Sequence, residues 1–399
     1  MSVAVDADVL IAGGGLAAQR CCETLRRGGF DGRIVMVCGE RRSPYDRPAL
    51  SKAVLMGERE VSTLAYREPR WYREHGIELL LGTAARQLDA AAHIVELDGA
   101  LRVRYGRLVI TTGSRPRPLP MFGVSERVQQ LRTAADAQAL RRALAGATGE
   151  LVVIGAGLIG LEVASAARAL GRAVTVIEAA PTPLARALPP ALGMWIAELH
   201  RQHGVEMRLA TAVEGVEHDS REVHMKLSDG TRVSAGTVLL AVGTVPATGW
   251  LAGSGLGPGA IHVDAGGRTD VADVYAAGDA ACYPGPHPGR RIPTQHWEGA
   301  ARQGAAVARS LLGGEPLPEP PSMFWSDQHG RRIQLVGHSP EGGDVELEGD
   351  PATSDFIAWI THAELAPAAL LVNRPDVLPR ARARIAASYS NQPTTRRSR

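Results

Sequence analysis

Residues 152–179 read VVIGAGLIGLEVASAARALGRAVTVIEA. An apolar run ends at a glycine-rich turn, a helical pattern of apolar residues follows, and a second apolar run closes the stretch. This order predicts a buried strand over 151–154, a helix over 158–170 and a further strand over 173–177. A strand, a glycine turn, a helix and a second parallel strand form the unit that binds dinucleotides.

The three glycines of this turn, Gly155, Gly157 and Gly160, have separate tasks in such a unit. They allow the tight turn, the approach of the backbone to a pyrophosphate, and the close packing of helix on strand. The helix N-terminus offers free N–H groups and the positive end of its dipole to the phosphates. Glu178 follows the second strand, where a carboxylate accepts hydrogen bonds from the ribose hydroxyls of an adenosine.

A second copy of the pattern lies near the start of the chain, in VLIAGGGLAAQRC at residues 9–21. Gly13, Gly15 and Ala18 occupy its turn, and Glu40 follows its second strand. One such motif is weak evidence. Two motifs, each with its own acid, predict an α/β fold with two Rossmann-like dinucleotide-binding domains. A chain that holds two dinucleotides can pass electrons from one to the other.

The composition indicates a globular protein whose main partner is not nucleic acid. The 399 residues are enough for two or three domains, 22% of them are charged, and the formal net charge is only +2. No apolar stretch is long enough to span a membrane and no secretory signal is visible, so we expect a cytoplasmic protein. The cysteines have neither zinc-binding nor redox-active spacing. We expect reduced, apolar side chains at Cys21, Cys22, Cys38 and Cys282.

Further motifs extend along almost the whole chain, up to about residue 380. They are PYDRPALSK at 44–52, TTGSRPR at 111–117, GLIGLEVA at 157–164, AAGDAA at 276–281 and FWSDQ at 324–328. With these motifs the sequence resembles the NADH-dependent ferredoxin reductases that serve oxygenases and cytochromes P450. The resemblance implies a glutathione-reductase-like architecture, with FAD in the first cradle and NADH in the second.

The resemblance also implies how the chain divides into domains. A discontinuous FAD-binding domain takes residues 1–113 and 244–320, and the NAD-binding domain takes 114–243. A small α/β domain with a frayed basic tail takes 321–399.

For FAD, the resemblance implies particular roles at several positions. Asp279 accepts hydrogen bonds from the ribityl chain, Glu40 binds the adenosine ribose, and Ala17 lies at the pyrophosphate. The backbone of Ala85 lies beside the adenine, and Trp325 reaches the redox centre. Arg117 is expected near the flavin or its phosphates, as is Arg47. The expected FAD contacts are Gly13, Gly15, Ala17, Glu40, Arg47, Lys52, Ala85, Thr112, Gly113, Arg132, Asp279 and Trp297.

For NADH, the resemblance implies a second set of contacts and a catalytic pair. The expected NADH contacts are Gly155, Gly157, Ile159, Gly160, Glu162, Glu178 and Gly243. Lys52 is expected beside flavin N5, paired with Glu162, so that the FAD and NAD domains are linked at the point of hydride transfer. The residue type agrees, because Lys52 is one of only two lysines among 44 basic residues and arginine has a different shape. No arginine directly follows Glu178, so we expect NADH to be preferred over NADPH.

The function implied is that of an FAD-dependent NADH:ferredoxin reductase. Its partner is a small acidic iron–sulfur ferredoxin, which serves an oxygenase or a cytochrome P450. The expected docking arginines are Arg290, Arg291, Arg331 and Arg332. No metal site is expected, and the chain is either a monomer or a homodimer.

Two alternatives remain open on the same scaffold. The acceptor is then rubredoxin, a quinone or oxygen, or the chain is a flavin-binding signalling protein that turns over slowly. NADH oxidases and disulfide reductases rely on reactive cysteines at positions where this sequence has none, so those two classes are disfavoured.

Overall fold

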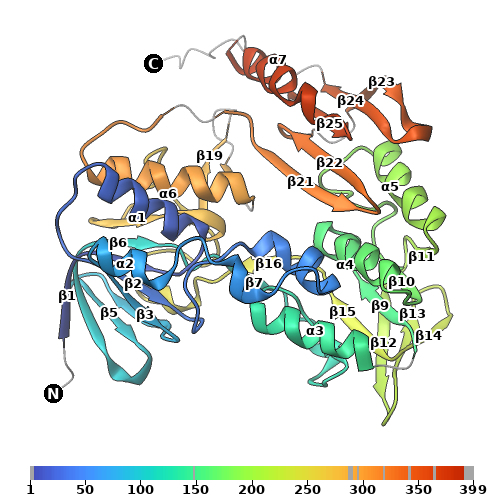
Figure 1. The fold of residues 1–399 in the computed structure, drawn as a ribbon, viewed down its shortest axis with the longest axis horizontal. Helices are drawn as coiled ribbons and strands as arrows, with labels where there is room; N and C mark the ends of the chain where they lie inside the picture. The colour runs from blue at the N-terminus through green and yellow to red at the C-terminus, as the bar shows by residue number, and fades with distance from the viewer. Residues whose placement is uncertain are drawn as a thin grey trace. The chain divides into compact units, whose positions relative to one another are not determined.

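The computed structural model describes residues 4–146, 149–285, 291–293, 296–317, 320–339, 343–362 and 365–390. The chain forms two compact units, each assembled from separate parts of the sequence (Figure 1). The first unit comprises Met1–Asp46, Ser62–Arg115 and Thr244–Glu319. The second comprises Arg47–Val61, Pro116–Gly243 and Pro320–Arg399. Within the described residues, no helix is both long and apolar enough to cross a membrane.

A mixed sheet forms the centre of the first unit. Its strand order is β3-β2-β1-β6-β5-β4, and β18 also pairs with β6. The parallel strands are β1 (Ala4–Ala12), β2 (Ile34–Cys38), β3 (Ile77–Leu81), β6 (Arg102–Ile110) and β18 (Val274–Ala276). The antiparallel strands are β4 (Ala85–Asp89) and β5 (Ile94–Leu97). Every residue of β2 is buried, as expected for the interior of a parallel sheet.

Two helices cover one face of this sheet, α1 (Leu16–Arg27) and α6 (Trp297–Leu311). They lie side by side although they are far apart in the sequence (Figure 1). The shorter helix α2 (Pro69–Glu74) precedes β3. A small separate sheet consists of β17 (Ile261–His262), β19 (Ala281–Pro284) and β20 (Arg291–Pro293). Two further strands, β7 (Ser114–Pro116) and β16 (Thr244–Pro246), lie where the chain passes from one unit to the other.

The second unit contains a fully parallel sheet of order β11-β10-β9-β15-β8. Its strands are β8 (Val128–Gln129), β9 (Leu151–Ile154), β10 (Val174–Ile177), β11 (Val205–Arg208) and β15 (Thr237–Leu240). Its helices are α3 (Ala134–Gly146), α4 (Leu158–Ala169) and α5 (Pro190–Gln202). These bounds confirm the predicted strand at 151–154 and the helix start at 158, and the helix ends one residue earlier than predicted.

Two antiparallel sheets complete the second unit. The first has the order β12-β13-β14, with strands β12 (Val213–His218), β13 (Val223–Leu227) and β14 (Arg232–Ala235). The second has the order β21-β22-β25-β24-β23. Its elements are β21 (Met323–Gln328), β22 (Arg331–Val336), β23 (Asp344–Asp350), β24 (Asp355–His362), β25 (Leu365–Val372) and helix α7 (Leu378–Ser390).

The C-terminal sheet and the parallel sheet of the second unit share one apolar core. Ile333 and Phe356 from the C-terminal sheet are buried in the same cluster as Leu161 of α4 and Ile196 of α5. Strand β21 therefore lies against α4, the helix that follows the second glycine turn. The division into three domains, with residues 321–399 as a domain of their own, stays a prediction. The tail at 391–399 lies outside the described residues.

Candidate functional site: two dinucleotide cradles and a buried ion pair

The first glycine turn joins β1 to α1 in the first unit. Gly13 has a φ of +126°, and a Cβ atom built there would lie 2.1 Å from the backbone oxygen of Thr111, so only glycine fits. Gly15 caps α1 without a side-chain hydrogen bond, and a Cβ built there would meet no heavy atom within 4 Å. Ala18, in place of a third glycine, is fully buried. The first turn of α1 therefore presents bare backbone to open space, which suits a pyrophosphate.

Glu40 lies just beyond β2, at the sheet edge where this turn also lies. Its carboxylate accepts a hydrogen bond from the Tyr45 hydroxyl at 2.8 Å. Its backbone oxygen accepts a hydrogen bond at 3.0 Å from the N–H of Gly82, in the loop that leads into β4. Because β4 begins at Ala85, this bond brings Glu40 and Ala85 to one corner of the unit. They are the two positions expected at the adenosine.

The turn at Gly278 and Asp279 packs against the start of α1. A Cβ built at Gly278 would lie 3.4 Å from the Cβ of Ala17. The Asp279 carboxylate accepts a hydrogen bond from the Ser114 hydroxyl at 2.7 Å. In the loop after β6, the Thr112 hydroxyl is buried and has no hydrogen-bond partner among the described residues. Buried hydroxyls normally have a partner, so this one fits a place for a bound ligand.

Trp297 is the first residue of α6 and is held by two hydrogen bonds. Its indole N–H is shared between a carboxylate oxygen of Asp46, at 2.9 Å, and the Tyr66 hydroxyl, at 3.1 Å. The Tyr66 hydroxyl in turn donates to Asp46 at 3.2 Å. The ring is therefore fixed at the helix start, while its contact with FAD stays a prediction. The same holds for Gly113, which has a φ of +71° in the loop after β6.

The second glycine turn joins β9 to α4 in the second unit and repeats the geometry of the first. Gly155 has a φ of +104°, and a Cβ built there would lie 2.6 Å from the backbone oxygen of Ala241. Gly157 caps α4 without a side-chain hydrogen bond. A Cβ at Gly160 would lie 2.2 Å from the Gly155 oxygen, so the helix can approach the strand only with glycine there. Ile159 is 43% exposed on the first helical turn and offers an apolar surface to a ligand.

The Glu178 carboxylate is attached to this turn. One oxygen accepts a hydrogen bond from the Ala156 N–H at 2.6 Å, and the other accepts from the Ala180 N–H at 2.8 Å. Gly243 follows β15, and its backbone oxygen accepts a hydrogen bond from the Arg117 N–H at 2.9 Å. The Arg186 guanidinium lies 3.5 Å from a Cβ built at Gly243.

Glu162 and Lys52 form a buried ion pair within the second unit. The Lys52 Nζ lies 2.8 Å from Glu162 Oε1, and only 4% of the Glu162 side chain and 17% of the Lys52 side chain are exposed. Both residues belong to this unit because the segment Arg47–Val61 packs there. Two hydroxyls complete the carboxylate: Ser51 donates to Oε2, and Ser326 donates to Oε1 at 2.7 Å. The pair itself was expected, whereas sequence reasoning missed both serines.

Arg47 and Arg132 also lie in the second unit and contact one another. The Arg47 guanidinium donates to the backbone oxygen of Arg132 at 2.7 Å. The Asp136 carboxylate accepts a hydrogen bond from the Arg132 N–H at 3.0 Å at the start of α3. The expected contact of these two arginines with FAD stays a prediction, as does the approach of Trp325 to the redox centre.

The expected docking arginines are partly engaged within the chain. Arg332 pairs with Asp327 at 2.5 Å. Arg291 donates to the backbone oxygen of Val263 at 2.9 Å. Arg290 lies outside the described residues. The charge of Arg332 is therefore balanced by a carboxylate within the chain, and the docking role of the four arginines stays a prediction.

All four cysteines are buried thiols. Burial raises the pKa of Cys21 to about 12 and holds the pKa of Cys22 well above its usual value. Burial also raises the pKa of Cys282. Thiols that stay protonated are poor nucleophiles, which agrees with the expectation of reduced, apolar side chains.

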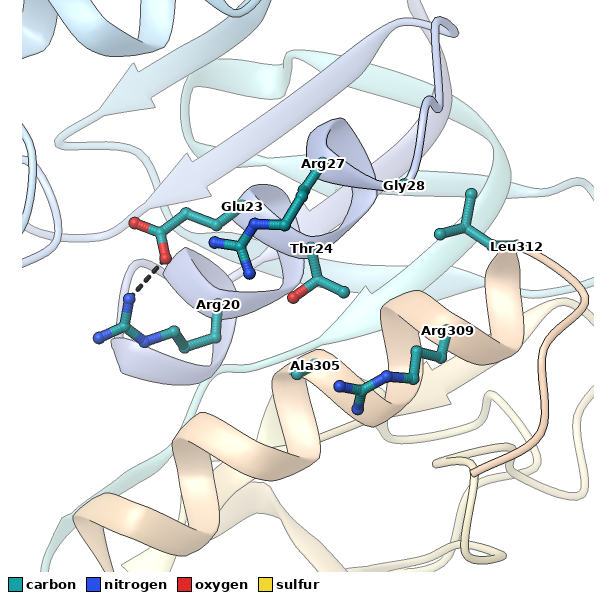
Figure 2. A pocket seen from close by; sticks show the side chains of 8 residues that line it. All are labelled: Arg20, Glu23, Thr24, Arg27, Gly28, Ala305, Arg309 and Leu312. Carbon is teal, nitrogen blue, oxygen red and sulfur yellow. Dashed lines mark hydrogen bonds and ion pairs between the residues drawn. The ribbon is translucent and has the colours of Figure 1, made fainter. Parts of the chain in front are cut away.

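A cavity of about 570 Å³ lies apart from both cradles. It runs from the second turn of α1 to the C-terminal ends of α1 and α6, between Arg20, Glu23 and Arg27 on one helix and Ala305 and Arg309 on the other (Figure 2). The first cradle lies at the opposite end of α1. This cavity is therefore not part of the dinucleotide site.

Comparison with known proteins shows the family to which this chain belongs. Residues 7–304 match the pyridine nucleotide-disulphide oxidoreductases, and residues 323–397 match the reductase C-terminal domain. The chain belongs to the pyridine nucleotide-disulphide oxidoreductase family.

Similar members of this family come from dioxygenase systems. The ferredoxin–NAD(+) reductase component of the anthranilate 1,2-dioxygenase system of Burkholderia cepacia is 36% identical, over 88% of this chain and 86% of that protein. The ferredoxin reductase component of the chlorobenzene dioxygenase of a Cupriavidus strain is 38% identical, over 86% of this chain and 83% of that protein. The solved covalent complex of putidaredoxin reductase with putidaredoxin has 32% identity and a TM-score of 0.90, over 96% of this chain and 94% of that chain.

Members of the pyridine nucleotide-disulphide oxidoreductase family use FAD and NAD(H). The residues of this chain fit those groups. Each unit has a glycine turn with an uncapped helix N-terminus and an acid at the matching sheet edge, and the first also has the orphan hydroxyl of Thr112. The chain is therefore an NADH-dependent oxidoreductase that binds FAD.

Proposed function

We propose that this oxidoreductase carries electrons from NADH, through FAD, to a small acidic iron–sulfur ferredoxin that serves an oxygenase or a cytochrome P450. The observation that carries the proposal is the presence of two dinucleotide cradles in one chain whose cysteines are all buried thiols. A redox-active cysteine pair is therefore not the route by which electrons pass from the flavin to the acceptor. The relatives, which are ferredoxin reductase components of dioxygenase systems, support the choice of acceptor.

Each group of residues has a defined task in this reaction. The first turn of α4 and Glu178 bind the pyrophosphate and the adenosine ribose of NADH, which orients the nicotinamide end. Lys52 supplies a compact positive charge at the point where negative charge develops, and the low exposure of the pair strengthens that interaction. Glu162 holds the Lys52 ammonium in place. FAD, when bound, accepts a hydride and releases the two electrons one at a time.

The decisive experiment is a panel of purified ferredoxins from the same organism, mixed with the FAD-loaded protein and NADH. The readout is reduction of cytochrome c as the terminal acceptor. We expect one or more acidic ferredoxins to raise the rate by about tenfold or more over a reaction without ferredoxin, since a docked partner replaces a chance encounter. Oxygen uptake, quinone reduction and rubredoxin reduction are measured in parallel.

A ferricyanide assay without ferredoxin is the control for the NADH–FAD half of the reaction. If ferricyanide is reduced quickly while no ferredoxin accelerates cytochrome c reduction, the ferredoxin proposal is wrong. Rapid use of oxygen, a quinone or rubredoxin would then name the acceptor. Slow turnover with every acceptor would favour the signalling protein.

A further inference from the structure

The Glu162 carboxylate stands at one end of a buried chain of hydrogen bonds that its pairing with Lys52 does not explain. Ser326 donates to Glu162 Oε1 at 2.7 Å, and the Gln328 side-chain amide donates to Ser326 Oγ at 2.9 Å. These hydrogen bonds lead away from the ion pair along β21, because the side chains of residues 326 and 328 lie on the same face of that strand. Ser326 is 0% exposed and Gln328 is 1% exposed.

Two histidines continue the chain. Nε2 of His200, on α5, lies 2.9 Å from the Gln328 Oε1 atom, and Nδ1 of His200 lies 3.1 Å from Nε2 of His329. His200 is completely buried. The ring of His203 stacks on His329 with centroids 4.2 Å apart. Among the described residues, no group of three or more His, Cys, Asp or Glu side chains is arranged to hold a metal ion.

The direction of the hydrogen bonds in this series follows from the orientation of the Gln328 amide. The Gln328 amide gives its N–H to Ser326, so its oxygen faces His200 and the hydrogen of that contact must be on His200 Nε2. The other ring nitrogen of a neutral His200 is then an acceptor, and His329 Nε2 is its donor. Each donor therefore points toward Glu162. Hydrogen bonds aligned in series polarise one another, and a charged acceptor at the end gains from all of them.

We propose that Ser326, Gln328 and the neutral form of His200 are positioning residues that hold the Glu162 carboxylate in one orientation, aimed at Lys52. A buried carboxylate stays charged and fixed only when its oxygens are fully satisfied. Ser51 donates to one oxygen of the Glu162 carboxylate, and Ser326, at the end of the hydrogen-bond series, donates to the other. These two bonds fix the orientation of the carboxylate and therefore the position of the Lys52 Nζ atom. The consequence for hydride transfer rests on the function proposed above, but the effect on Lys52 does not.

The test uses the fact that the chain has only two lysines. Trace labelling of the FAD-loaded protein with an amine-reactive anhydride, read by peptide mass spectrometry, gives the labelling ratio of Lys52 to Lys226. Lys226 is an internal reference because its side chain is 57% exposed and pairs with Glu214. Both residues lie on the β12-β13-β14 sheet, which contains neither Glu162 nor Ser326. The variants are Ser326→Ala, which removes the last donor, and Gln328→Met, which removes the amide and keeps the length of the side chain.

We expect the ratio to rise by about threefold or more in both variants, because a Glu162 that has lost its second anchor holds the Lys52 ammonium less tightly. Ser326→Thr keeps the hydroxyl and should return the ratio toward that of the wild type. Thr175→Val is the matched control, since Thr175 is as deeply buried and donates to Glu150, away from Glu162. It should leave the ratio unchanged even if it lowers stability.

Stopped-flow reduction of the bound FAD by NADH provides the second readout. In Ser326→Ala and Gln328→Met, the limiting rate should fall by about fivefold, because a displaced Glu162 no longer holds Lys52 in its wild-type place, and Ser326→Thr should recover most of that rate. If the labelling ratio is that of the wild type in both variants, the inference is wrong. A changed ratio in a protein that reduces no ferredoxin would support the hydrogen-bond chain and reject only the proposed acceptor.

Discussion

Three carboxylates, those of Glu178, Glu40 and Glu162, are each oriented by hydrogen bonds or an ion pair. Glu178 accepts one hydrogen bond from the Ala156 N–H of the second glycine turn and one from the N–H of Ala180, two residues further along the chain. Glu40 is oriented by Tyr45, and Glu162 is surrounded by Lys52 and two serines. A carboxylate oxygen can accept more than one hydrogen bond, so Glu178 can still bind ribose hydroxyls.

Glu178 should make the enzyme prefer NADH over NADPH. Its negative charge at the ribose position repels a 2′-phosphate by about 1 kcal/mol in an exposed geometry. Glu178→Gln should therefore raise kcat/KM for NADPH by about fivefold. Glu206→Gln, an exposed acid on β11, should leave the ratio of the two coenzymes unchanged. Equal kcat/KM values for NADH and NADPH in the wild type would contradict this prediction.

Lys52 should be needed for flavin reduction and not for FAD binding. If Lys52 stabilises the negative charge of the reduced flavin as proposed, Lys52→Met should slow flavin reduction by NADH by about tenfold or more in stopped flow with FAD content unchanged. Lys52→Arg should recover only part of the rate because the guanidinium has a different shape. Lys226→Met is the matched control on the surface. A Lys52→Met protein that is reduced at the wild-type rate would leave Lys52 without a catalytic role.

At the scale of elements, both cradles depend on glycines that allow backbones to touch. Gly160 lets α4 approach β9, and Gly304 does the same for the two helices of the first unit. A Cβ at Gly304, inside α6, would lie 2.1 Å from the backbone oxygen of Ala17 in α1. The start of α1, and with it the first cradle, is therefore held against α6.

Gly304→Ala should destabilise the first unit although alanine favours a helix. The helix propensity alone predicts a gain of about 1 kcal/mol, but the clash is with backbone, and overpacking of this kind costs about 1–3 kcal/mol. We expect a lower Tm and weaker retention of FAD, measured by thermal unfolding and by absorbance after dialysis. Gly146→Ala, at the end of α3 where a Cβ would meet nothing within 4 Å, is the control and should not lower the Tm.

At the scale of the whole molecule, titration and salt report on burial and on docking. Burial lowers the pKa of His200 to about 4 and that of His329 to about 3, from a usual value of 6.5. His200, the His203 ring and the Arg168 guanidinium also lower the pKa of His329. The hydrogen-bond chain to Glu162 therefore keeps its direction throughout the neutral range.

Stability should fall as the pH is lowered from about 6.5 toward 4. In that window the unfolded chain binds a proton at His200 that the folded protein does not bind, so unfolding is favoured. The pKa shift of His200 corresponds to about 2 kcal/mol between pH 7.5 and pH 5. Urea unfolding at both pH values measures it. His200→Gln should remove the part of this dependence that comes from His200 and leave the part that comes from His329, whereas exposed His262→Gln should leave both. An equal slope in the wild type and in His200→Gln would contradict the assignment.

Docking of an acidic ferredoxin should depend on salt. With a net charge of only +2 on the chain, the attraction must come from a local patch and must be screened within about 10 Å at 0.1 M salt. We expect kcat/KM for ferredoxin to fall steeply between about 0.05 M and 0.5 M salt. The rate with an uncharged quinone as acceptor should change much less, which isolates the docking step. A kcat/KM for ferredoxin that does not change with ionic strength would exclude electrostatic docking.

Both cradles and their acids could be predicted from local sequence. Strand, glycine turn, helix and acid follow one another within a short stretch, so local spacing specifies them, and the backbone clashes at Gly13 and Gly155 explain the residue types. The surroundings of Glu162 could not be predicted in this way and become visible only in the folded chain. Ser51 and Ser326 are 111 and 164 residues away from it in sequence, and His200 comes from a different helix. Such contacts depend on how the C-terminal sheet packs on α4 and α5, which no local spacing encodes.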